Sequence, residues 1–397
     1  MIDLDPALPG FVLLIAILSA LALAARLLRV PQVVGYLVAG VLVGRHGIGV
    51  VSDPAVMQRL GEVGVMLLLF HAGLDLSPRS LAARWRVALV GVGLQIALTT
   101  ALTFGLGAVL GWPFSRSLLI GFTVSLSSTV VVLKLLEGWG EQRSRLGRDV
   151  LTMLVAQDLA VVPMLIVVGL ADGDIDMSDA WRVLLQLAGA GLFAALALVL
   201  VARHAVRLPF RRAIEGERDL QVLLALLLCF GLALASALLR LSVAFGAFVA
   251  GMLVRALHET EWVADSLLGL RTVFIALFFV SIGLLIDTGF IARHWVETAA
   301  LVLLVLVANT FINAVVLRTL GQPWALSVYG GSMMSQIGEF SFVLVSAGLG
   351  AGLITRADYQ LAASVIALSL AASPLWIAAV RRATGLGRRP PSPPRPP

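Results

Sequence analysis

The chain alternates between long apolar stretches and short stretches that hold its charged residues, prolines and glycines. Dividing it at these short stretches gives thirteen apolar segments, which are residues 8–29, 31–44, 55–76, 83–111, 115–137, 145–171, 180–206, 217–239, 240–257, 262–286, 292–318, 324–349 and 356–384. Most of them are long enough to cross a bilayer as a helix, which takes about 20 residues. The two shorter segments, 31–44 and 240–257, are expected to be tilted, broken or buried among the others.

Composition favours the same interpretation. Hydrophobic residues make up 59% of the 397 residues and charged residues 13%, so a soluble domain of this length would lack the polar residues that cover its surface. The net charge is +6, but the basic residues lie between apolar segments, which is typical of a membrane protein and argues against a nucleic-acid partner. The predicted fold class is an all-α polytopic membrane protein with 13 transmembrane helices.

Short patterns recur along the chain at a spacing of 210 or 211 residues. The matching pairs are YLVAGVLV (36–43) with AFVAGMLV (247–254), FHAGLDL (70–76) with VSIGLLI (280–286), GWPFSRSLLIG (111–121) with GQPWALSVYGG (321–331), and AQDLAVVPML (156–165) with ALSLAASPLW (367–376). The first six segments therefore pair with the last six, and the seventh connects them. Because paired segments cross the membrane in opposite directions, we predict 6+1+6 inverted repeats, as in many secondary transporters.

The repeats divide the chain into parts. These are helices 1–4 of the first repeat (8–111), its core helices 5 and 6 (115–171), the connector helix (180–206), scaffold helices 8–10 of the second repeat (217–286), its core helices 11–13 (292–384) and a disordered tail (385–397). Of the 29 lysines and arginines, 22 lie at alternate junctions and in the tail. The positive-inside rule therefore predicts a cytoplasmic carboxyl end and an external amino end.

One carboxylate lies in the middle of an apolar segment. At 1.5 Å per residue, Asp158 is roughly 17–20 Å from the start of segment 145–171, near the midplane of a bilayer. An ionised carboxylate there costs roughly 2.5–3.5 kcal/mol. Pro163 cannot donate to the carbonyl of Leu159, which stays free close to the carboxylate. No lysine or arginine is expected at this depth, so we interpret Asp158 as an ion-binding residue.

Two further segments carry polar clusters at a similar depth, and they are repeat partners. They hold Ser127, Ser128 and Thr129 in the first half, and Ser335, Gln336, Gly338 and Glu339 in the second. Such clusters indicate helices that break in mid-membrane and expose backbone carbonyls. A hard monovalent cation prefers oxygen ligands of this kind, so we predict a cation site at Asp158 beside two broken helices.

Most of these polar residues also have a purely structural interpretation. Serines in membrane helices often bond the preceding turn of their own helix, as Ser127 could. Gln157 could hold two helices together, and Glu339 could pair with an arginine or a helix end. His71 could sense pH, but a packing role fits it better.

Several classes of protein are excluded by missing motifs. The sequence has no Walker A motif, so ATP is not the predicted energy source. It has no HExxH motif and no nucleophile elbow, and one mid-membrane aspartate cannot form a protease dyad. The single cysteine, Cys229, permits no disulfide within the chain. We therefore expect neither an enzyme nor a bound cofactor.

Taken together, the motifs resemble the monovalent cation:proton antiporter-2 family, near the Kef-type potassium/proton antiporters. The resemblance covers residues 10–385 and rests on VVGYLVAGVLVG, GVMLLLFHAGLDL, SLSSTVVVL, AQDLAVVP, VAFGAFVAGMLV, ALFFVSIGLLID and SQIGEFSFVL, which occur in family order. It implies a homodimer in the bacterial cytoplasmic (inner) membrane, with a scaffold and a moving core. In the core, the fifth and twelfth helices would be broken and crossed.

The resemblance also implies roles for single residues. Asp158 would carry the ion and the proton, with Gln157, Thr129, Ser128 and Ser127 beside it, while Ser335, Gln336, Glu339 and Asn309 would support the crossing helices. The Gln157–Asp158 pair matches the Kef-type branch and favours potassium. At Asn309, many family members carry a lysine. Kef-type systems have a cytoplasmic nucleotide-binding regulatory domain. For this sequence three expectations stay open: that such gating is absent, that the domain was removed, or that a separate cytoplasmic subunit supplies it.

The predicted function is a secondary active transporter that exchanges K⁺ for H⁺ by alternating access at a single carboxylate. Protonation of Asp158 and binding of a cation exclude each other, because each removes the charge that the other needs. Three alternatives stay open. They are Na⁺/H⁺ exchange by the same residues, a K⁺ channel, and a sodium-coupled symporter for organic anions.

Overall fold

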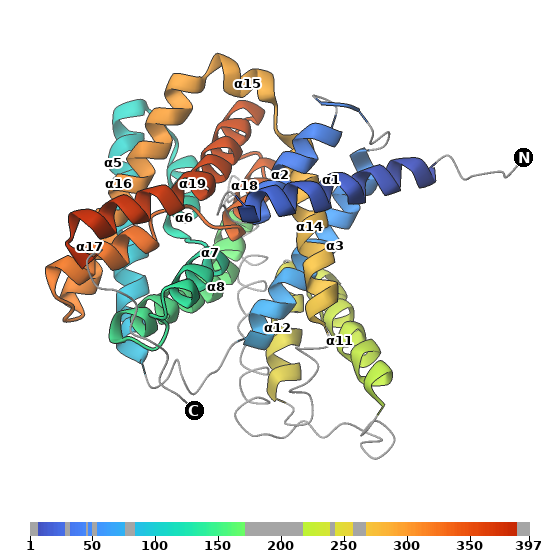
Figure 1. The fold of residues 1–397 in the computed structure, drawn as a ribbon, viewed down its shortest axis with the longest axis horizontal. Coiled ribbons are helices and arrows are strands. Elements are labelled where there is room, and N and C mark those ends of the chain that lie inside the picture. Colours follow the sequence, from blue (N-terminus) through green and yellow to red (C-terminus); the bar gives the residue numbers. More distant parts are fainter. Residues whose placement is uncertain are drawn as a thin grey trace, which may run out of the picture. The chain divides into compact units, whose positions relative to one another are not determined.

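A computed structural model describes residues 7–27, 32–44, 47–49, 54–75, 84–170, 217–238, 243–256 and 267–386. Every regular element in these ranges is a helix, which confirms the predicted all-α fold class (Figure 1). The predicted connector, 180–206, and residues 387–397 of the predicted tail lie outside the described residues. The count of thirteen helices therefore stays a prediction.

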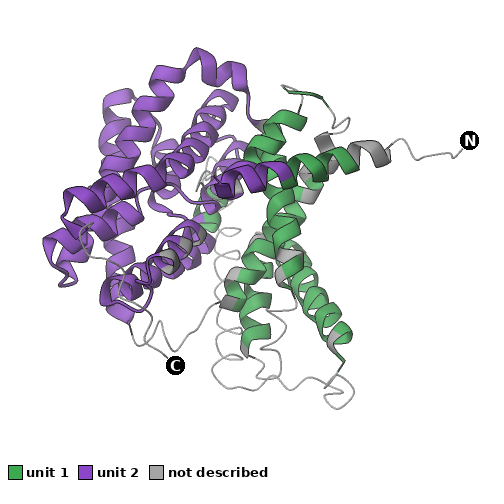
Figure 2. Cartoon of the chain, in the orientation of Figure 1, with its two compact units in different colours: residues 1–19, 36–77, 165–285 green, residues 20–35, 78–164, 286–397 purple. Residues whose placement is uncertain are grey.

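Several of the described helices are long and apolar enough to cross a membrane. Within the described ranges there are five, and they are Arg86–Leu110, Arg145–Gly169, Asp219–Leu238, Trp295–Thr319 and Arg356–Ala383. Shorter apolar helices accompany them, as expected for a bundle that contains broken helices. The chain divides into two compact units, shown in Figure 2: unit 1 comprises residues 1–19, 36–77 and 165–285, and unit 2 comprises residues 20–35, 78–164 and 286–397.

Unit 1 contains helices from both repeats. They are α2 (Gln32–Val43) for most of its length, α3 (Pro54–Asp75), α11 (Arg218–Leu238), α12 (Val243–Ala256) and α14 (Leu268–Leu285), with the first part of α1 (Ala7–Leu27). Two glycine contacts bring their backbones close together. A Cβ on Gly40 would lie 2.2 Å from the carbonyl oxygen of Val280, and one on Gly73 would lie 2.2 Å from that of Phe248. In a membrane the hydrophobic effect does not drive helices together, so they associate through close backbone packing, which small residues allow.

Unit 2 contains the remaining described helices. They are the π-helical turn η1 (Arg86–Gly91), α5 (Val92–Leu110), α6 (Phe114–Ser125), α7 (Thr129–Gly138), most of α8 (Arg145–Leu170), α15 (Thr288–Arg293), α16 (Trp295–Thr319), α17 (Trp324–Met333), α18 (Phe340–Gly350) and α19 (Arg356–Ala383). Buried apolar side chains of α7, α8, α16, α17 and α19 form its core, which includes Leu136, Leu154, Leu317, Met333 and Ile377.

The two halves of unit 2 repeat the same turn and the same helix contact. Gly111 and Gly321 have φ of +68° and +90°, a conformation that favours glycine, and each is followed two residues later by a proline in the N-cap position of the next helix. Gly331 of α17 approaches α16 so closely that a Cβ would lie 2.3 Å from the carbonyl oxygen of Thr310. Gly121 of α6 approaches Thr100 of α5 in the same way.

Candidate functional site

Unit 2 contains two interrupted helices, as the polar clusters predict. α6 ends at Ser125 and α7 begins at Thr129, and the residue after α6, Leu126, is extended. α17 ends at Met333 and α18 begins at Phe340. The residues between these helices leave backbone N–H and C=O groups without helical partners.

The two breaks lie against each other. The N–H of Gly338 donates to the carbonyl of Leu126 at 2.8 Å, and the hydroxyl of Ser127 donates to the carbonyl of Met334 at 2.8 Å. A Cβ on Gly338 would lie only 2.7 Å from the backbone of Ser127, so this crossing requires a glycine. The predicted pair of crossed, broken helices is therefore present.

Helix α8 places its Gln-Asp pair beside the first break. The hydroxyl of Thr129 donates to Oδ2 of Asp158 at 2.9 Å. The N–H of Ser127 donates to Oε1 of Gln157 at 3.1 Å. Gln157 is fully buried, whereas Asp158 is partly exposed. The amide thus fixes the backbone of the break, and the carboxylate stays accessible beside it.

A second glutamine, Gln95, was not among the predicted site residues and completes this arrangement. Nε2 of Gln157 donates to Oε1 of Gln95 at 3.1 Å, and Nε2 of Gln95 donates to the carbonyl of Ser125 at 2.8 Å. Gln95 is fully buried. Its signal was present in the sequence, because it is an amide in the otherwise apolar segment 83–111. The two amides together bind the backbone on both sides of the first break.

The second half of the crossing is held by asparagines. Nδ2 of Asn309 donates to the carbonyls of Val124 and Ser335, at 2.9 and 3.2 Å, and so binds both broken helices. Nδ2 of Asn313, one turn later, donates to the carbonyl of Met334 at 3.3 Å. Asn309 was a predicted support residue, and Asn313 was not predicted.

The repeat also relates individual hydrogen bonds. Ile337 lies 210 residues after Ser127, and the backbone N–H of each donates to a side chain of the last helix of its own repeat. That of Ser127 donates to Gln157 of α8, and that of Ile337 donates to Ser369 of α19 at 3.2 Å, one position further along the repeat. The spacing of 211 residues pairs Ser369 with Asp158, and that of 210 pairs Glu339 with Thr129. The first half thus has a hydroxyl residue at the break and a carboxyl residue on the following helix, and the second half has the carboxyl residue at the break and the hydroxyl residue on the following helix.

The remaining four predicted site residues have other surroundings. The hydroxyl of Ser128 accepts the N–H of Val131 at 3.4 Å, so it caps the start of α7. Gln336 is fully buried, and neither its Nε2 nor its Oε1 has a hydrogen-bond partner among the described residues. Glu339, just before α18, is 5% exposed. Ser335, a predicted support residue, bonds the carbonyl of Ser332 through its hydroxyl.

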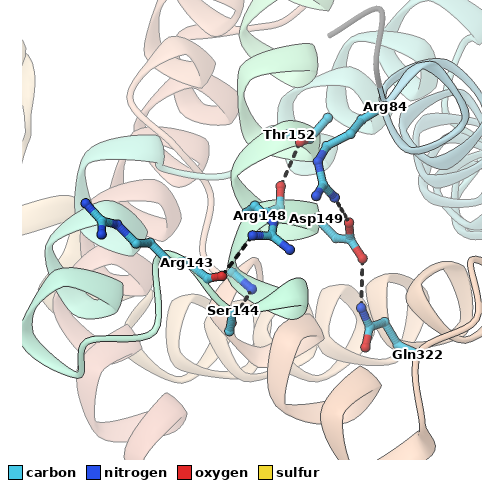
Figure 3. Close-up of polar contacts among 8 residues, drawn as sticks. Arg84, Arg143, Ser144, Arg148, Asp149, Thr152 and Gln322 are labelled. Atoms are coloured by element: carbon cyan, nitrogen blue, oxygen red, sulfur yellow. Dashed lines mark hydrogen bonds and ion pairs between the residues drawn. The ribbon is translucent and has the colours of Figure 1, made fainter. Parts of the chain in front are cut away.

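Two groups of ion pairs and hydrogen bonds connect the helices of unit 2 at the end where α8 begins. Asp149, in the first turns of α8, forms an ion pair with Arg84, which precedes η1, and accepts a hydrogen bond from Gln322, which precedes α17 (Figure 3). Glu141 accepts hydrogen bonds from Tyr329 at 2.9 Å and from Arg381 at 3.0 Å. These contacts join helices of both repeats at the end where α8 begins.

The carboxylate of Asp158, the hydroxyl of Thr129 and the backbone of the broken helix therefore provide oxygen ligands of the kind that suits a hard monovalent cation. Within the described ranges, no three histidine, cysteine, aspartate or glutamate side chains gather as they would around a transition metal. A single accessible carboxylate can hold a proton or one cation at a time.

Comparison with known proteins agrees with this chemistry. The family model described as "Sodium/hydrogen exchanger, transmembrane" matches residues 12–382. The chain belongs to the sodium/hydrogen exchanger family. This membership confirms the predicted relationship to cation/proton antiporters. It also confirms the predicted class, a multi-pass membrane transporter that exchanges a cation for protons. The family consists of transporters, not of enzymes.

Individual relatives match over most of the chain. The chain is 35% identical over 356 residues to the iron transporter MagA of Paramagnetospirillum magneticum, covering 89% of this chain and 81% of MagA. It is 31% identical over 369 residues to the putative cation/proton antiporter YbaL of Escherichia coli, covering 91% of this chain and 66% of YbaL. The solved structure of the sodium proton antiporter MjNhaP1 from Methanocaldococcus jannaschii has a TM-score of 0.69 at 15% identity, covering 96% and 97% of the two chains, and shows the shared fold.

Proposed function

We propose that this protein exchanges K⁺ for H⁺ across the membrane, with Asp158 as the residue that holds either the cation or the proton. The observation that carries the proposal is the hydrogen bond from Thr129 to the partly exposed carboxylate of Asp158, beside a broken helix. The donated hydrogen stabilises the ionised carboxylate. Hydroxyl, carboxylate and carbonyl oxygens around it would replace the water shell of a monovalent ion.

The exchange follows from competition at this single carboxylate. When Asp158 is protonated, its charge is neutralised and a cation is no longer attracted. When a cation is bound, its positive charge disfavours protonation. Alternating access to the two sides, with unit 2 as the moving core that the family resemblance implies, then couples the flows of the two ions in opposite directions.

Potassium is favoured by the neutral neighbour of Asp158. Gln157 is fully buried and both ends of its amide are engaged, by Ser127 and Gln95. It therefore supplies no second negative charge, so a weakly charged site binds the larger and less strongly hydrated cation. Na⁺/H⁺ exchange through the same residues is the second candidate, because the matching family and MjNhaP1 are both described as sodium/proton proteins.

The orientation that we propose places the start of α8 in the cytoplasm. Arg86, Arg145, Arg318 and Arg382 lie at the ends of four candidate spans of unit 2, and the contacts of Asp149 and Glu141 bring these ends together. Basic residues of this kind favour the cytoplasmic side. A homodimer and a separate cytoplasmic regulatory subunit are proposed from the family resemblance alone.

Proton flux in sealed vesicles tests the proposal. The purified protein is placed in vesicles with an imposed proton gradient and a pH-sensitive dye inside, and potassium, sodium, lithium or choline chloride is added. We expect potassium to dissipate the gradient and choline to have no effect. A sodium-only response would leave the exchange mechanism standing and overturn the choice of ion. Cation currents that are independent of the proton gradient would indicate a channel, and the absence of any response would overturn the proposal.

A further inference from the structure

The two ends of unit 2 differ in charge. The end where α8 begins carries Arg84, Arg86, Arg143, Arg145, Arg148, Arg318, Arg381 and Arg382. Of the acidic side chains that the structure describes at this end, Asp149 is held by Arg84 and Gln322, and Glu141 by Arg381 and Tyr329. At the opposite end the described charges balance, because Arg116, Arg293 and Arg356 are accompanied by Asp287, Glu297 and Asp358. Among the described side chains, positive charges thus exceed negative ones at the end where α8 begins.

Two of these arginines converge on one turn from different helices. The turn joins α16 to α17 and contains Gly321, whose φ is +90°. Nη1 of Arg318 donates to the carbonyl of Gln322 at 3.2 Å. Nη2 of Arg145, from the start of α8, lies 3.5 Å from the position of a Cβ on Gly321. Neither guanidinium forms an ion pair with a carboxylate in the described part of the chain, so two like charges meet at one place without a counter-ion.

Both arginines lie at the ends of candidate membrane spans. Arg145 is the first residue of the candidate span Arg145–Gly169, and Arg318 is next to the last residue of the span Trp295–Thr319. Trp324, at the start of α17, is 53% exposed, and the Arg318 guanidinium lies 5.8 Å from its ring centre. Exposed tryptophans favour the depth of the lipid headgroups. The converging charges therefore face the headgroup layer.

This combination fits one kind of ligand. A guanidinium binds a phosphate oxygen pair through two parallel hydrogen bonds. An exposed indole beside it would pack against the glycerol and upper acyl chain of the same molecule, which a free phosphate does not have. We propose that the α16–α17 turn, with Arg145, Arg318 and Trp324, binds the phosphodiester headgroup of an anionic phospholipid. The proposal is independent of which cation the protein carries.

Tryptophan quenching by brominated lipids tests this site on the full chain. The protein is placed in vesicles that contain either brominated phosphatidylglycerol or brominated phosphatidylcholine. The signal of Trp324 is isolated by subtracting the spectrum of Trp324→Phe. We expect phosphatidylglycerol to quench Trp324 at a lower mole fraction than phosphatidylcholine. Trp295, 65% exposed at the other end of α16, is the control probe and should show no such preference.

Charge variants assign the preference to the two arginines. Each basic residue near the surface contributes about fivefold to the binding of anionic lipid, so Arg145→Gln with Arg318→Gln should lower the preference by roughly thirtyfold. Arg145→Lys with Arg318→Lys keeps both charges but loses the paired hydrogen bonds, so it should keep part of the preference and lie between the unmodified protein and the double glutamine variant. Arg293→Gln with Arg356→Gln removes two charges at the opposite end and should leave the Trp324 preference unchanged.

Three results would overturn the proposal. The first is equal quenching of Trp324 by the two lipids in the unmodified protein. The second is a preference that survives the double glutamine variant. The third is displacement of phosphatidylglycerol by inorganic phosphate beyond the effect of sodium chloride at equal ionic strength, which would show a site for a free anion.

Discussion

Gln157 binds two buried polar groups at once, and its removal has an effect that can be worked out from the structure. Its Oε1 accepts the N–H of Ser127 and its Nε2 donates to Gln95, each at 3.1 Å. Leucine has a similar volume, so Gln157→Leu removes both hydrogen bonds and leaves little cavity. The N–H of Ser127 and Oε1 of Gln95 then stay buried without partners.

Each buried group left without a partner costs about 1–3 kcal/mol, so Gln157→Leu should lower the free energy of unfolding by about 2–6 kcal/mol. Gln95→Leu also leaves two groups unpaired, the Nε2 of Gln157 and the carbonyl of Ser125, and should cost a similar amount. The double variant leaves only the Ser127 N–H and the Ser125 carbonyl. It should therefore cost no more than either single variant, which corresponds to a large coupling energy.

The assay is reversible unfolding of the purified protein in lipid–detergent micelles, followed by circular dichroism. Gln142→Leu, on the turn before α8, is the matched control and should change the unfolding free energy little. If the losses of unfolding free energy in the two single variants add in the double variant, Gln157 and Gln95 do not act as one connected hydrogen-bond network. A Gln157→Leu protein as stable as the original would refute the reasoning altogether.

Two further substitutions test the site and the helix contact behind it. Thr129→Val removes a hydrogen bond to a charged group, worth about 1.5–3 kcal/mol, and should raise the cation concentration for half-maximal exchange about tenfold or more. Thr129→Ser keeps the hydroxyl and should leave this concentration unchanged. The same half-maximal concentration in both variants would contradict the contact with Asp158. Gly331→Ala places a methyl group 2.3 Å from the carbonyl oxygen of Thr310 and should cost about 1–3 kcal/mol of unfolding free energy. Gly105→Ala is the control, because its added Cβ would have no neighbouring atom within 4 Å, and it should be neutral or stabilising. Equal unfolding free energies for Gly331→Ala and Gly105→Ala would contradict the close approach of α16 and α17.

The two helix breaks and the position of the candidate site beside them could be predicted from the sequence because polar residues are costly in a membrane. An acid or a run of polar residues inside an apolar segment therefore has a specific reason to be there. This logic found Asp158 and both breaks, at Ser127–Thr129 and at Ser335–Glu339. The repeat spacing added a second, independent signal, and the structure shows the repeat again in the paired contacts of Gly121 and Gly331.

The division of labour among the polar residues could not be predicted in the same way. Gln95 and Asn313 are single amides in apolar helices, and the sequence does not show that they face the breaks. Ser128 was a predicted ligand, but a helix that begins at Thr129 has free N–H groups, and the hydroxyl of Ser128 binds one of them. Such assignments depend on which helices cross, and this is a property of the tertiary structure.

The role of Asp158 is tested most directly by proton flux through Asp158→Asn in the vesicle assay. The asparagine keeps the size of the side chain and can still accept from Thr129, but it can neither ionise nor take up a proton. Glu297→Gln, an exposed carboxylate in the first turn of α16, is the matched control. We predict that cations no longer dissipate the proton gradient in Asp158→Asn, while Glu297→Gln behaves like the unmodified protein. Cation-driven proton flux of normal size in Asp158→Asn would contradict the exchange mechanism at this carboxylate.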